Sequence, residues 1–459
     1  MVILTLGAVG LLVYLILKGV NPVLSMLSIG IVVLIIMQYA TQTSVLGDAT
    51  TGIYFLDIFK YIYNQAIGMW TTMGATTAFI LGYVGLMQFT KANDFFALTL
   101  ATKLSKMKSK WVIYAGTMFL AMVIKWLGPN QVTVILILIS TVYPVLLALK
   151  VNRLTAISVI TICSGIGWGP ATPITPMTFA FAGESMSAVD YFMNTELIYF
   201  VPMFIAIVLV FAITTPMWER KEAKKGLLYE ANTTDIEQVD PKSFGLPGYY
   251  MLLPLMPIIM VILFGGIAFP SLKLDTGAIY FLAAVLVLIL QFIRAKEKKV
   301  DQISEDMASF WKGFGDSITM IYPFVIGGMV FSAAIGMLGG VNILVDALGT
   351  GSSSQIGFMI IVYLATTLFV FLAGMGSGFM PVGAILGTYI VASGADASLI
   401  FSTFMLFAAI GNSTSLTAQG QLVAAGAAEL NVVQISKRNI IPLLAGGVVA
   451  FVIGITIHM

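Results

Sequence analysis

The residues best suited to bind a solute lie in four interruptions of otherwise apolar segments, at residues 128–131, 165–176, 374–378 and 411–415. These interruptions are rich in glycine, proline, amide or hydroxyl residues, which can hydrogen-bond a solute but do not act as strong acids or bases. A broken helix within a bilayer is costly unless it lines a cavity, because its freed backbone groups need polar partners. The candidate substrate-binding residues in and beside the interruptions are Asn130, Gln131, Thr133, Thr172, Thr175, Gly376, Ser377, Gly378, Asn412, Ser413, Thr414 and Ser415.

Each interruption also creates ends of half-helices. An N-terminal end attracts a carboxylate, whereas free carbonyl groups at a C-terminal end attract a cation. Converging ends therefore predict a site for a small anion, with Na⁺ or H⁺ as candidate coupling ions. Other interpretations stay open: a surface turn at 128–131, threonine-filled kinks at 165–176 and close helix packing at 374–378.

Lys125 is the one cation that we expect at depth in the membrane, three residues before the first interruption. A charge in that position is a functional candidate, because intramembrane charges are costly. Lys125 would then neutralise a carboxylate of the substrate. The alternative is structural: its long side chain reaches the interface or a backbone carbonyl group.

Composition excludes several classes of protein. The chain has 459 residues, of which 59% are apolar and 10% are charged, whereas soluble proteins average about 45–50% and about 25%. The net charge of +2 argues against a nucleic-acid partner. A single cysteine, Cys163, and a single histidine, His458, exclude an intramolecular disulfide and catalysis by a Ser–His or Cys–His pair. We expect a polytopic membrane protein that contacts the lipid bilayer and needs no cofactor.

Apolar segments recur in the same order in the two halves of the chain. In the first half they cover residues 2–17, 22–40, 73–90, 111–127, 132–149, 154–182 and 197–217. In the second half they cover residues 248–269, 277–292, 317–338, 355–373, 381–391, 397–428 and 439–459. Each half thus contains three spans, an interrupted pair, a broken helix and a closing helix. Residues 92–110 predict an amphipathic helix, either interfacial or an arm between two domains.

The distribution of charge predicts that each interrupted pair is a re-entrant hairpin. Each half then crosses the membrane five times, an odd number, so the two halves are inverted. With the N-terminus outside, 20 of the 23 Lys and Arg residues face the cytoplasm, all except Lys60, Lys125 and Lys273, as the positive-inside rule expects. If the pairs spanned fully, the basic loop at 150–153 would lie outside.

The predicted fold is therefore an all-α polytopic membrane protein with two inverted repeats, each of about five spans, one re-entrant hairpin and one broken helix. The first repeat covers residues 1–217, a cytoplasmic linker covers 218–246, and the second repeat covers 247–459. Paired broken helices of this kind are typical of secondary transporters that work by alternating access.

Two other classes of function fit less well. The G-x-G-D sequence at residues 313–316 is found in intramembrane aspartyl proteases, but that chemistry needs two facing carboxylates, and Asp316 has no acidic partner in a predicted span. We therefore expect no enzyme. A channel-like pore is the other alternative, although channels are usually built from continuous pore helices and filter rings.

Over nearly its whole length the chain resembles the DcuC-type anaerobic C4-dicarboxylate carriers, within a larger group of elevator-type transporters. The matching stretches are residues 183–191, the basic 218–221, residues 253–259, Gly376-Ser377-Gly378 with Pro381, and Lys437-Arg438. The resemblance implies a scaffold domain and a moving transport domain, in which the hairpins and broken helices form the site.

The resemblance also implies transport of succinate, fumarate or related acids across a bacterial inner membrane, and a homodimer formed through the scaffold. Two departures from the family bear on the substrate. Members carry an arginine after the glycine of the last interruption, where this chain has Asn412, and an acid in the second interruption, where it has residues 174–176. Without a guanidinium clamp, either Lys125 takes its place or the substrate is a monocarboxylate, an amino acid or another small polar solute.

Overall fold

The computed structural model describes residues 2–107, 109–127, 131–166, 169–172, 174–224, 240–265, 269, 271–272, 274–295, 299–340, 343, 352–373, 375–416 and 418–458. Within these residues the chain is almost entirely helical, as the apolar pattern predicts. Five helical stretches are long and apolar enough to cross a membrane, and shorter apolar helices accompany them.

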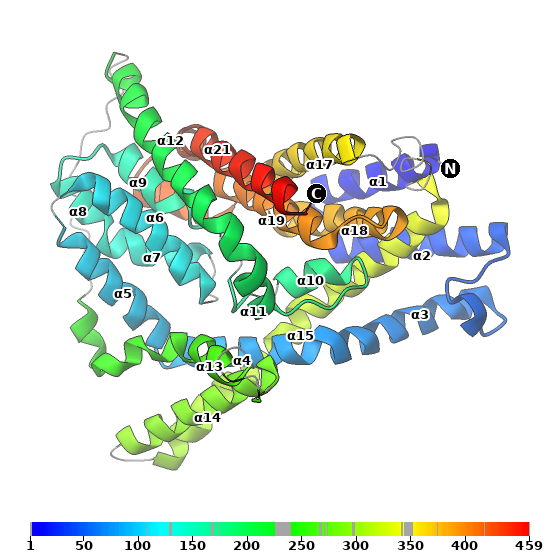
Figure 1. Cartoon of the computed structure of the whole chain (residues 1–459), viewed down its shortest axis with the longest axis horizontal. Helices are drawn as coiled ribbons and strands as arrows, with labels where there is room; N and C mark the ends of the chain where they lie inside the picture. Colours follow the sequence, from blue (N-terminus) through cyan, green and yellow to red (C-terminus); the bar gives the residue numbers. More distant parts are fainter. Residues whose placement is uncertain are drawn as a thin grey trace.

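One bundle of helices is organised around α15 (Lys299–Leu338), which runs diagonally through the molecule (Figure 1). α15 packs along α2 (Pro22–Thr41) and α4 (Ala75–Phe89), and α14 (Thr276–Arg294) also packs on α4. The remaining helices of this bundle are α1 (Val2–Leu17), α3 (Tyr54–Met69) and α13 (Met256–Phe264).

The contact between α4 and α15 explains the first glycine of the G-x-G-D sequence, Gly313, whereas a Cβ atom on Gly315 would meet nothing within 4 Å. A Cβ atom on Gly313 would lie 2.4 Å from the carbonyl oxygen of Leu81 and 3.2 Å from the Cα atom of Gly85. Small residues allow two helix backbones to approach this closely. Asp316, in turn, pairs with Lys312 at 3.3 Å on the exposed face of α15. This sequence therefore lies at a helix-packing site.

The structure corrects the expected bounds of three segments. α3 and α4 are joined by a π-helical turn (Trp70–Gly74), so helix begins well before residue 73. α15 has 40 residues and begins at Lys299 rather than near residue 317, because its charged first part continues as helix outside the apolar region. The segment at 248–269 contains 3-10 turns and the short α13, because Pro254 and Pro257 lack the N–H groups that a continuous helix needs.

A second bundle contains the segments with interruptions. Its helices are α6 (Lys110–Trp126), α7 (Gln131–Thr141), α8 (Tyr143–Ala148), α9 (Arg153–Ile162), α10 (Ile174–Ala180), α11 (Ala188–Tyr191), α12 (Leu197–Lys224), α17 (Ser352–Ala373), α18 (Met375–Ser393), α19 (Ala397–Thr414), α20 (Gln419–Ala427) and α21 (Val432–His458). α5 (Ala92–Ser105) leads from α4 to α6 and packs against α6 and α7.

The closing helices of the two halves, α12 and α21, pack against each other in antiparallel directions (Figure 1). Near the end of α12, Glu222 pairs with Arg438 near the start of α21 at 2.7 Å. Near the start of α12, the ring of Tyr199 stacks on that of His458 at the end of α21, with ring centroids 6.3 Å apart. The two closing helices therefore run in opposite directions across the molecule.

The largest hydrophobic core draws its side chains from both halves of the chain, including Ile160 of α9 and Phe404 of α19, neither of which is exposed. A separate core lies around α4, α14 and the first part of α15, with Phe310 at its centre. The two halves are thus intertwined. The largest core also includes Met26 of α2 and Phe331 of α15, so the first bundle packs against the second along these helices.

Candidate functional site

Positions along α21 serve here as a measure of depth in the second bundle. Arg438 near its start and His458 at its end are separated by about 30 Å at 1.5 Å per residue, which is close to the thickness of the hydrocarbon core. We call these two levels the Arg438 end and the His458 end.

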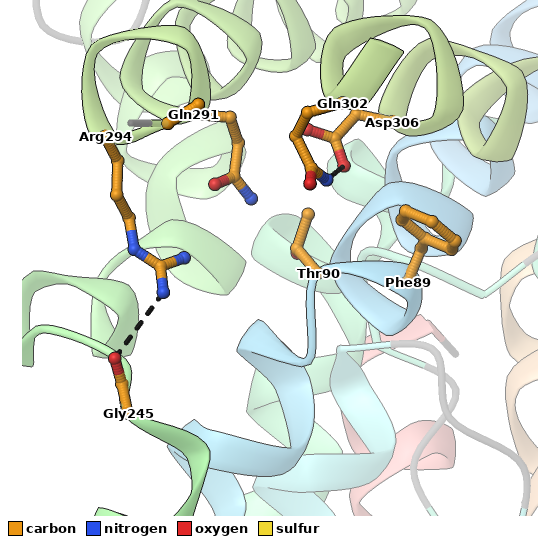
Figure 2. A pocket seen from close by; sticks show the side chains of 8 residues that line it. Phe89, Thr90, Gly245, Gln291, Arg294, Gln302 and Asp306 are labelled. Atoms are coloured by element: carbon orange, nitrogen blue, oxygen red, sulfur yellow. Dashed lines mark hydrogen bonds between the residues drawn. The ribbon is translucent and has the colours of Figure 1, made fainter. Parts of the chain in front are cut away.

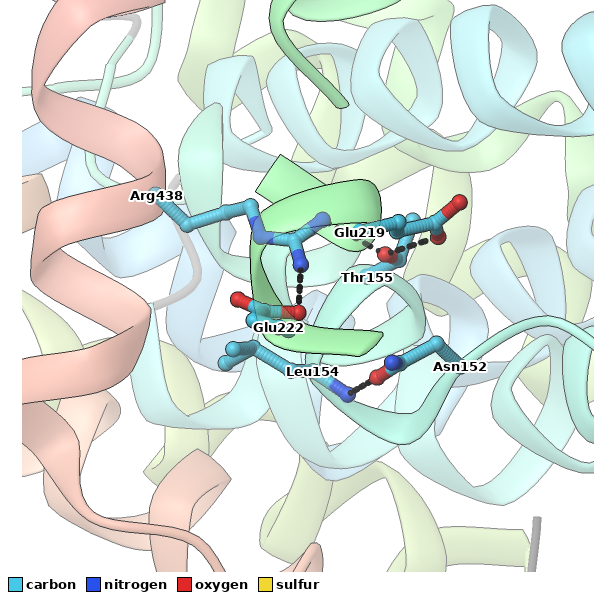
Figure 3. A network of polar contacts seen from close by, with 6 residues as sticks. All are labelled: Asn152, Leu154, Thr155, Glu219, Glu222 and Arg438. Carbon is cyan, nitrogen blue, oxygen red and sulfur yellow. Dashed lines mark hydrogen bonds and ion pairs between the residues drawn. The ribbon is translucent and has the colours of Figure 1, made fainter. Parts of the chain in front are cut away.

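α9 begins at the Arg438 end, in a network of polar contacts (Figure 3). The guanidinium group of Arg438 donates to Thr155 Oγ1 and to Glu222 Oε2, each at 2.7 Å. The Thr155 hydroxyl group donates to Glu219 at 2.7 Å, and the Asn152 side chain caps the helix by accepting from the N–H of Leu154 at 2.9 Å. Because Arg438 is only 2% exposed, this network fixes the start of α9 rigidly.

α19 begins at the opposite end. Its N-cap residue, Asp396, accepts from the N–H of Leu399 at 2.7 Å and lies 3.6 Å from the ring of His458. Nearly every residue of α19, and every residue of α9 after Arg153, is buried. The two broken helices thus enter the protein interior from opposite ends of α21.

The two broken helices meet near the middle of α21. There the Asn412 side-chain amide donates to Gln131 Oε1 at 3.1 Å, and the Gln131 amide donates to Ser164 Oγ at 3.2 Å. Gly447 lies about halfway between Arg438 and His458 on α21. A Cβ atom on Gly447 would lie 2.6 Å from Ile410, two residues before Asn412. We define the polar centre as the residues Gln131, Ser164, Asn412, Ser413 and Gln421.

Gly165 allows the close approach that forms the polar centre. A Cβ atom at this position would lie 2.4 Å from Ser413 Oγ, 3.1 Å from Gln131 Nε2 and 3.2 Å from Asn412 Nδ2. Any side chain would therefore enter the space that the amide and hydroxyl groups share. The glycine of the second interruption serves close packing between elements and not only a bend in the chain.

The hairpin of α6, α7 and α8 leads to the Arg438 end, where α9 follows α8. Near the start of α6, Tyr114 packs against Phe211 of α12, with centroids 6.2 Å apart. At the end of α6, Trp126 packs against Phe200 at 5.0 Å, one residue from Tyr199 and therefore close to the level of the His458 end. The chain returns through α7 and α8 to Arg153, beside Thr155. Gln131 begins α7, so the turn of this hairpin supplies the polar centre.

The hairpin of α17 and α18 has both outer ends at the His458 end. There Phe358 stacks on Tyr389 with centroids 4.1 Å apart. At the inner end of α17, the Phe371 carbonyl oxygen accepts from the Ser415 hydroxyl group at 3.0 Å and from the N–H of Leu416 at 3.3 Å. The inner ends of both hairpins therefore lie beside the interruption between α19 and α20.

The structure brings together some of the predicted site residues and separates others. Gln131, Asn412 and Ser413 lie in the polar centre, and Ser415 joins it to the second hairpin. The hydroxyl groups of Thr414 and Thr172 instead donate within their own segments, to Ile410 and Gly169. Backbone-bonded threonines of this kind fill a kink.

The other predicted residues are placed as follows. Lys125 lies in the last turn of α6 and Thr133 in the first turn of α7. Thr175, in the first turn of α10, is fully buried. Gly376, Ser377 and Gly378 lie in the first turn of α18, so they are helical rather than part of an open break. Asn130 lies outside the described residues.

Two residues of the polar centre, Ser164 and Gln421, were not predicted from the sequence. Ser164 accepts from Gln131, and the Gln421 side-chain amide donates to the carbonyl oxygen of Ser413 at 2.8 Å. Both stand beside a glycine, Ser164 before Gly165 and Gln421 after Gly420. A polar residue next to a glycine within a broken helix is the signal that could have identified them.

Chemically, the polar centre can bind a solute through hydrogen bonds. Its side chains are amides and hydroxyls, which neither ionise near neutral pH nor act as activated nucleophiles without a base. Ser413 Oγ and Gln421 Oε1 are buried and have no hydrogen-bond partner among the described residues. Such atoms cost about 1–3 kcal/mol each when unpaired, so a solute or water that bonded to them would be held there.

Comparisons with known proteins show the family to which the chain is similar. The family model described as C4-dicarboxylate anaerobic carrier, DcuC, matches residues 1–459. The anaerobic C4-dicarboxylate transporter DcuC of Escherichia coli K12 is 22% identical over 440 residues, covering 95% of this chain and 92% of the relative. A probable transporter of the same name from Vibrio cholerae is 22% identical over 445 residues, covering 96% and 94%. With its apolar helices, the chain is a multi-pass protein of the bacterial inner membrane, and a carrier rather than an enzyme.

Proposed function

Because the chain belongs to the DcuC family of anaerobic C4-dicarboxylate carriers, we propose that it transports small organic anions, with succinate- and fumarate-type C4-dicarboxylates as the first candidates. The observation that supports this most directly is the polar centre. It lies about halfway along α21, and elements that start from opposite ends of the molecule build it. A site at mid-depth, reached from either side, is what alternating access requires.

We propose further that the two halves are inverted repeats with re-entrant hairpins. The antiparallel packing of α12 and α21 supports the inversion, since these helices close corresponding halves. The opposite entry of α9 and α19 supports it as well. In this proposal each hairpin has both outer ends on one side, which agrees with the count of cytoplasmic cations.

Transport would be secondary active, by exchange or by coupling to Na⁺ or H⁺, with the second bundle moving as an elevator against the first. The separate hydrophobic core around α4, α14 and the first part of α15 supports a scaffold in this region. The second part of α15 shares the largest core with the second bundle and would form the contact along which that bundle moves. A homodimer through the scaffold bundle belongs to the same proposal. Light scattering of the detergent-solubilised protein would test it.

A second candidate is a solute with one carboxylate or none, such as a monocarboxylate or an amino acid. The polar centre favours it, because its charge-neutral amides Gln131, Asn412 and Gln421 offer no bidentate clamp for a carboxylate.

Lys125, near the turn of the first hairpin, is the cation that could compensate for the missing clamp. Lys125→Gln should weaken succinate binding more than that of a neutral solute, and unchanged affinity for succinate would remove Lys125 from the site.

The test is counterflow in proteoliposomes loaded with unlabelled succinate, fumarate, a monocarboxylate or an amino acid in turn. A carrier accumulates the labelled external solute transiently, whereas a channel-like pore only equilibrates it. Asn412→Ala should reduce counterflow about tenfold or more through loss of a partly buried hydrogen bond to Gln131, whereas Asn64→Ala, at an exposed position, should leave it unchanged. Counterflow that no solute supports, or that Asn412→Ala leaves at the wild-type rate, would contradict the proposal.

A further inference from the structure

A polar pocket lies away from the polar centre, in the first bundle. Its volume is about 630 Å³, within the range of small-molecule sites. It is formed where α4 and α14 end and α15 begins, on the face that the charge count places in the cytoplasm. Figure 2 shows its lining residues Phe89, Thr90, Gly245, Gln291, Arg294, Ala295, Gln302 and Asp306, of which the figure labels all but Ala295.

Arg294 forms one wall of this pocket. Its guanidinium group donates to the Tyr250 hydroxyl at 2.8 Å and to the Gly245 carbonyl oxygen at 3.5 Å, both of them uncharged acceptors. The Tyr250 hydroxyl in turn donates to Gln291 Oε1 at 2.6 Å. This chain of hydrogen bonds orients Arg294, yet no ion pair of the described residues neutralises its charge.

Asp306 forms the opposite wall. The residue is fully buried, and its Oδ1 accepts from the Gln302 amide at 3.2 Å. Its Oδ2 has no hydrogen-bond partner among the described residues. Burial raises the pKa of the Asp306 carboxyl group, and Arg294 acts on it in the opposite direction without contacting it. A buried carboxylate that is hydrogen-bonded through one oxygen is poorly compensated, so a cation placed beside it would be stabilised.

The surroundings of Asp306 also favour a cation. The pocket receives the C-terminal ends of α4 and α14, at Phe89–Thr90 and Arg294–Ala295, and helix C-termini carry a partial negative charge. The exposed Gln302 side chain covers Asp306. An ammonium group could replace the Gln302 amide and donate hydrogen bonds to the Asp306 carboxylate. An anionic group on the same molecule could then pair with the guanidinium group of Arg294.

We propose that this pocket binds a small zwitterion of the amino-acid class, with its ammonium group on Asp306 and its carboxylate on Arg294. The site shares no residue with the polar centre. One of its lining residues, Thr90, is the C-cap of α4. The next residue, Lys91, has a φ of +62°, and the chain turns there into α5. α5 packs against α6 and α7, the helices that present Gln131. A ligand bound here would therefore hold the joint between the scaffold bundle and the first hairpin.

The experiment is calorimetric titration of the purified full-length protein with glycine, β-alanine and 4-aminobutyrate, which differ in the spacing of their charges. Ethylamine and acetate, with one charge each, are the reference ligands. At least one zwitterion should bind more tightly than both reference ligands. Asp306→Asn and Arg294→Gln should each weaken its binding about tenfold or more, through loss of a charge-assisted hydrogen bond. Gln302→Ala, which uncovers Asp306, should bind at least as tightly as the wild type.

Asn412→Ala distinguishes this pocket from the polar centre. If the zwitterion still binds this variant and Asp306→Asn abolishes binding, the pocket is the site. If Asn412→Ala abolishes binding and Asp306→Asn does not, the amino acid occupies the polar centre and the proposal is wrong. Binding of ethylamine as tight as that of the zwitterions would overturn the role of Arg294, and absence of any binding would overturn the proposal entirely. Thermal unfolding of each variant identifies one that has failed to fold.

Discussion

Gly165 determines how closely the two broken helices approach each other. Gly165→Ala would place a methyl group 2.4 Å from Ser413 Oγ, so the side chains of the polar centre must move apart. We expect a loss of about 1–3 kcal/mol in stability, the usual cost of overpacking, and a larger relative loss of counterflow. The matched control is Gly426→Ala, where a Cβ atom would meet nothing within 4 Å. Wild-type counterflow in Gly165→Ala would show that the polar centre is not the transport site.

The polar centre was only partly predictable from the sequence. Gln131 and Asn412 stand out because amides are costly within apolar segments, but their pairing joins positions 281 residues apart and depends on the tertiary fold. Ser164 and Gln421 were missed because single polar residues are common in broken helices. Local patterns thus identify which residues need a polar partner, and packing decides which partner each one obtains.

At the scale of elements, the interruptions were predictable and several helix bounds were not. Glycine, proline and adjoining polar residues interrupt an apolar segment visibly, so helices end or begin near all four expected interruptions. The exact positions differ, because α19 continues as helix through Thr414 before it ends. The beginning of α15 at Lys299 was missed because its first turns are charged. Hydropathy predicts which part of a helix lies in the bilayer, but not how far the helix continues outside it. Similarly, α18 includes residues 376–378 despite two glycines, since neighbouring helices can stabilise a local sequence of low helix propensity.

The network around Arg438 fixes the ends of α9, α12 and α21 relative to one another. Arg438→Met should lower the free energy of unfolding by about 3–5 kcal/mol, because it leaves Glu222 without its partner in a largely buried position. Combining it with Glu222→Leu should restore part of the loss, since a hydrophobic pair removes the uncompensated charge. Thermal unfolding in detergent measures both effects. The neighbouring Lys437→Met, at an exposed position, should change little; equal losses for the two single variants would argue against the network.

The loop between α2 and α3 is held by one buried carboxylate, Asp57. Burial raises the pKa of Asp57, but hydrogen bonds from Ser44, Thr50 and Thr51, at 2.5–2.6 Å, outweigh burial and hold the pKa well below its usual value. The unfolded chain therefore takes up a proton first, at a pKa of about 3.9. Stability from this contact is complete above that pH and is lost as the pH falls further.

Asp57→Asn should remove this dependence. Near neutral pH the free energy of unfolding of the variant should be about 1–3 kcal/mol lower than that of the wild type. The reason is that an amide cannot accept all the hydrogen bonds that the charged carboxylate accepts. The difference between the two should shrink as the pH is lowered from about 4 to about 2. Unfolding curves across this range measure it, with the exposed Asp48→Asn as the control. A difference that stays constant with pH would mean that Asp57 is not charged in the folded protein.

At the scale of the whole molecule, the geometry depends on α9 and α19 starting from opposite faces of the membrane. Cysteines introduced at Leu149, before α9, and at Ala392, before α19, lie at exposed positions. The native Cys163 is buried and should stay unlabelled. A membrane-impermeant maleimide added to intact cells should label Ala392→Cys, and Leu149→Cys should react only after the membrane is opened. Because α12 and α21 are antiparallel, inversion of the halves requires this asymmetry. If Leu149→Cys reacts in intact cells, the first hairpin spans the membrane, the halves are no longer inverted, and the polar centre is not reached from both sides.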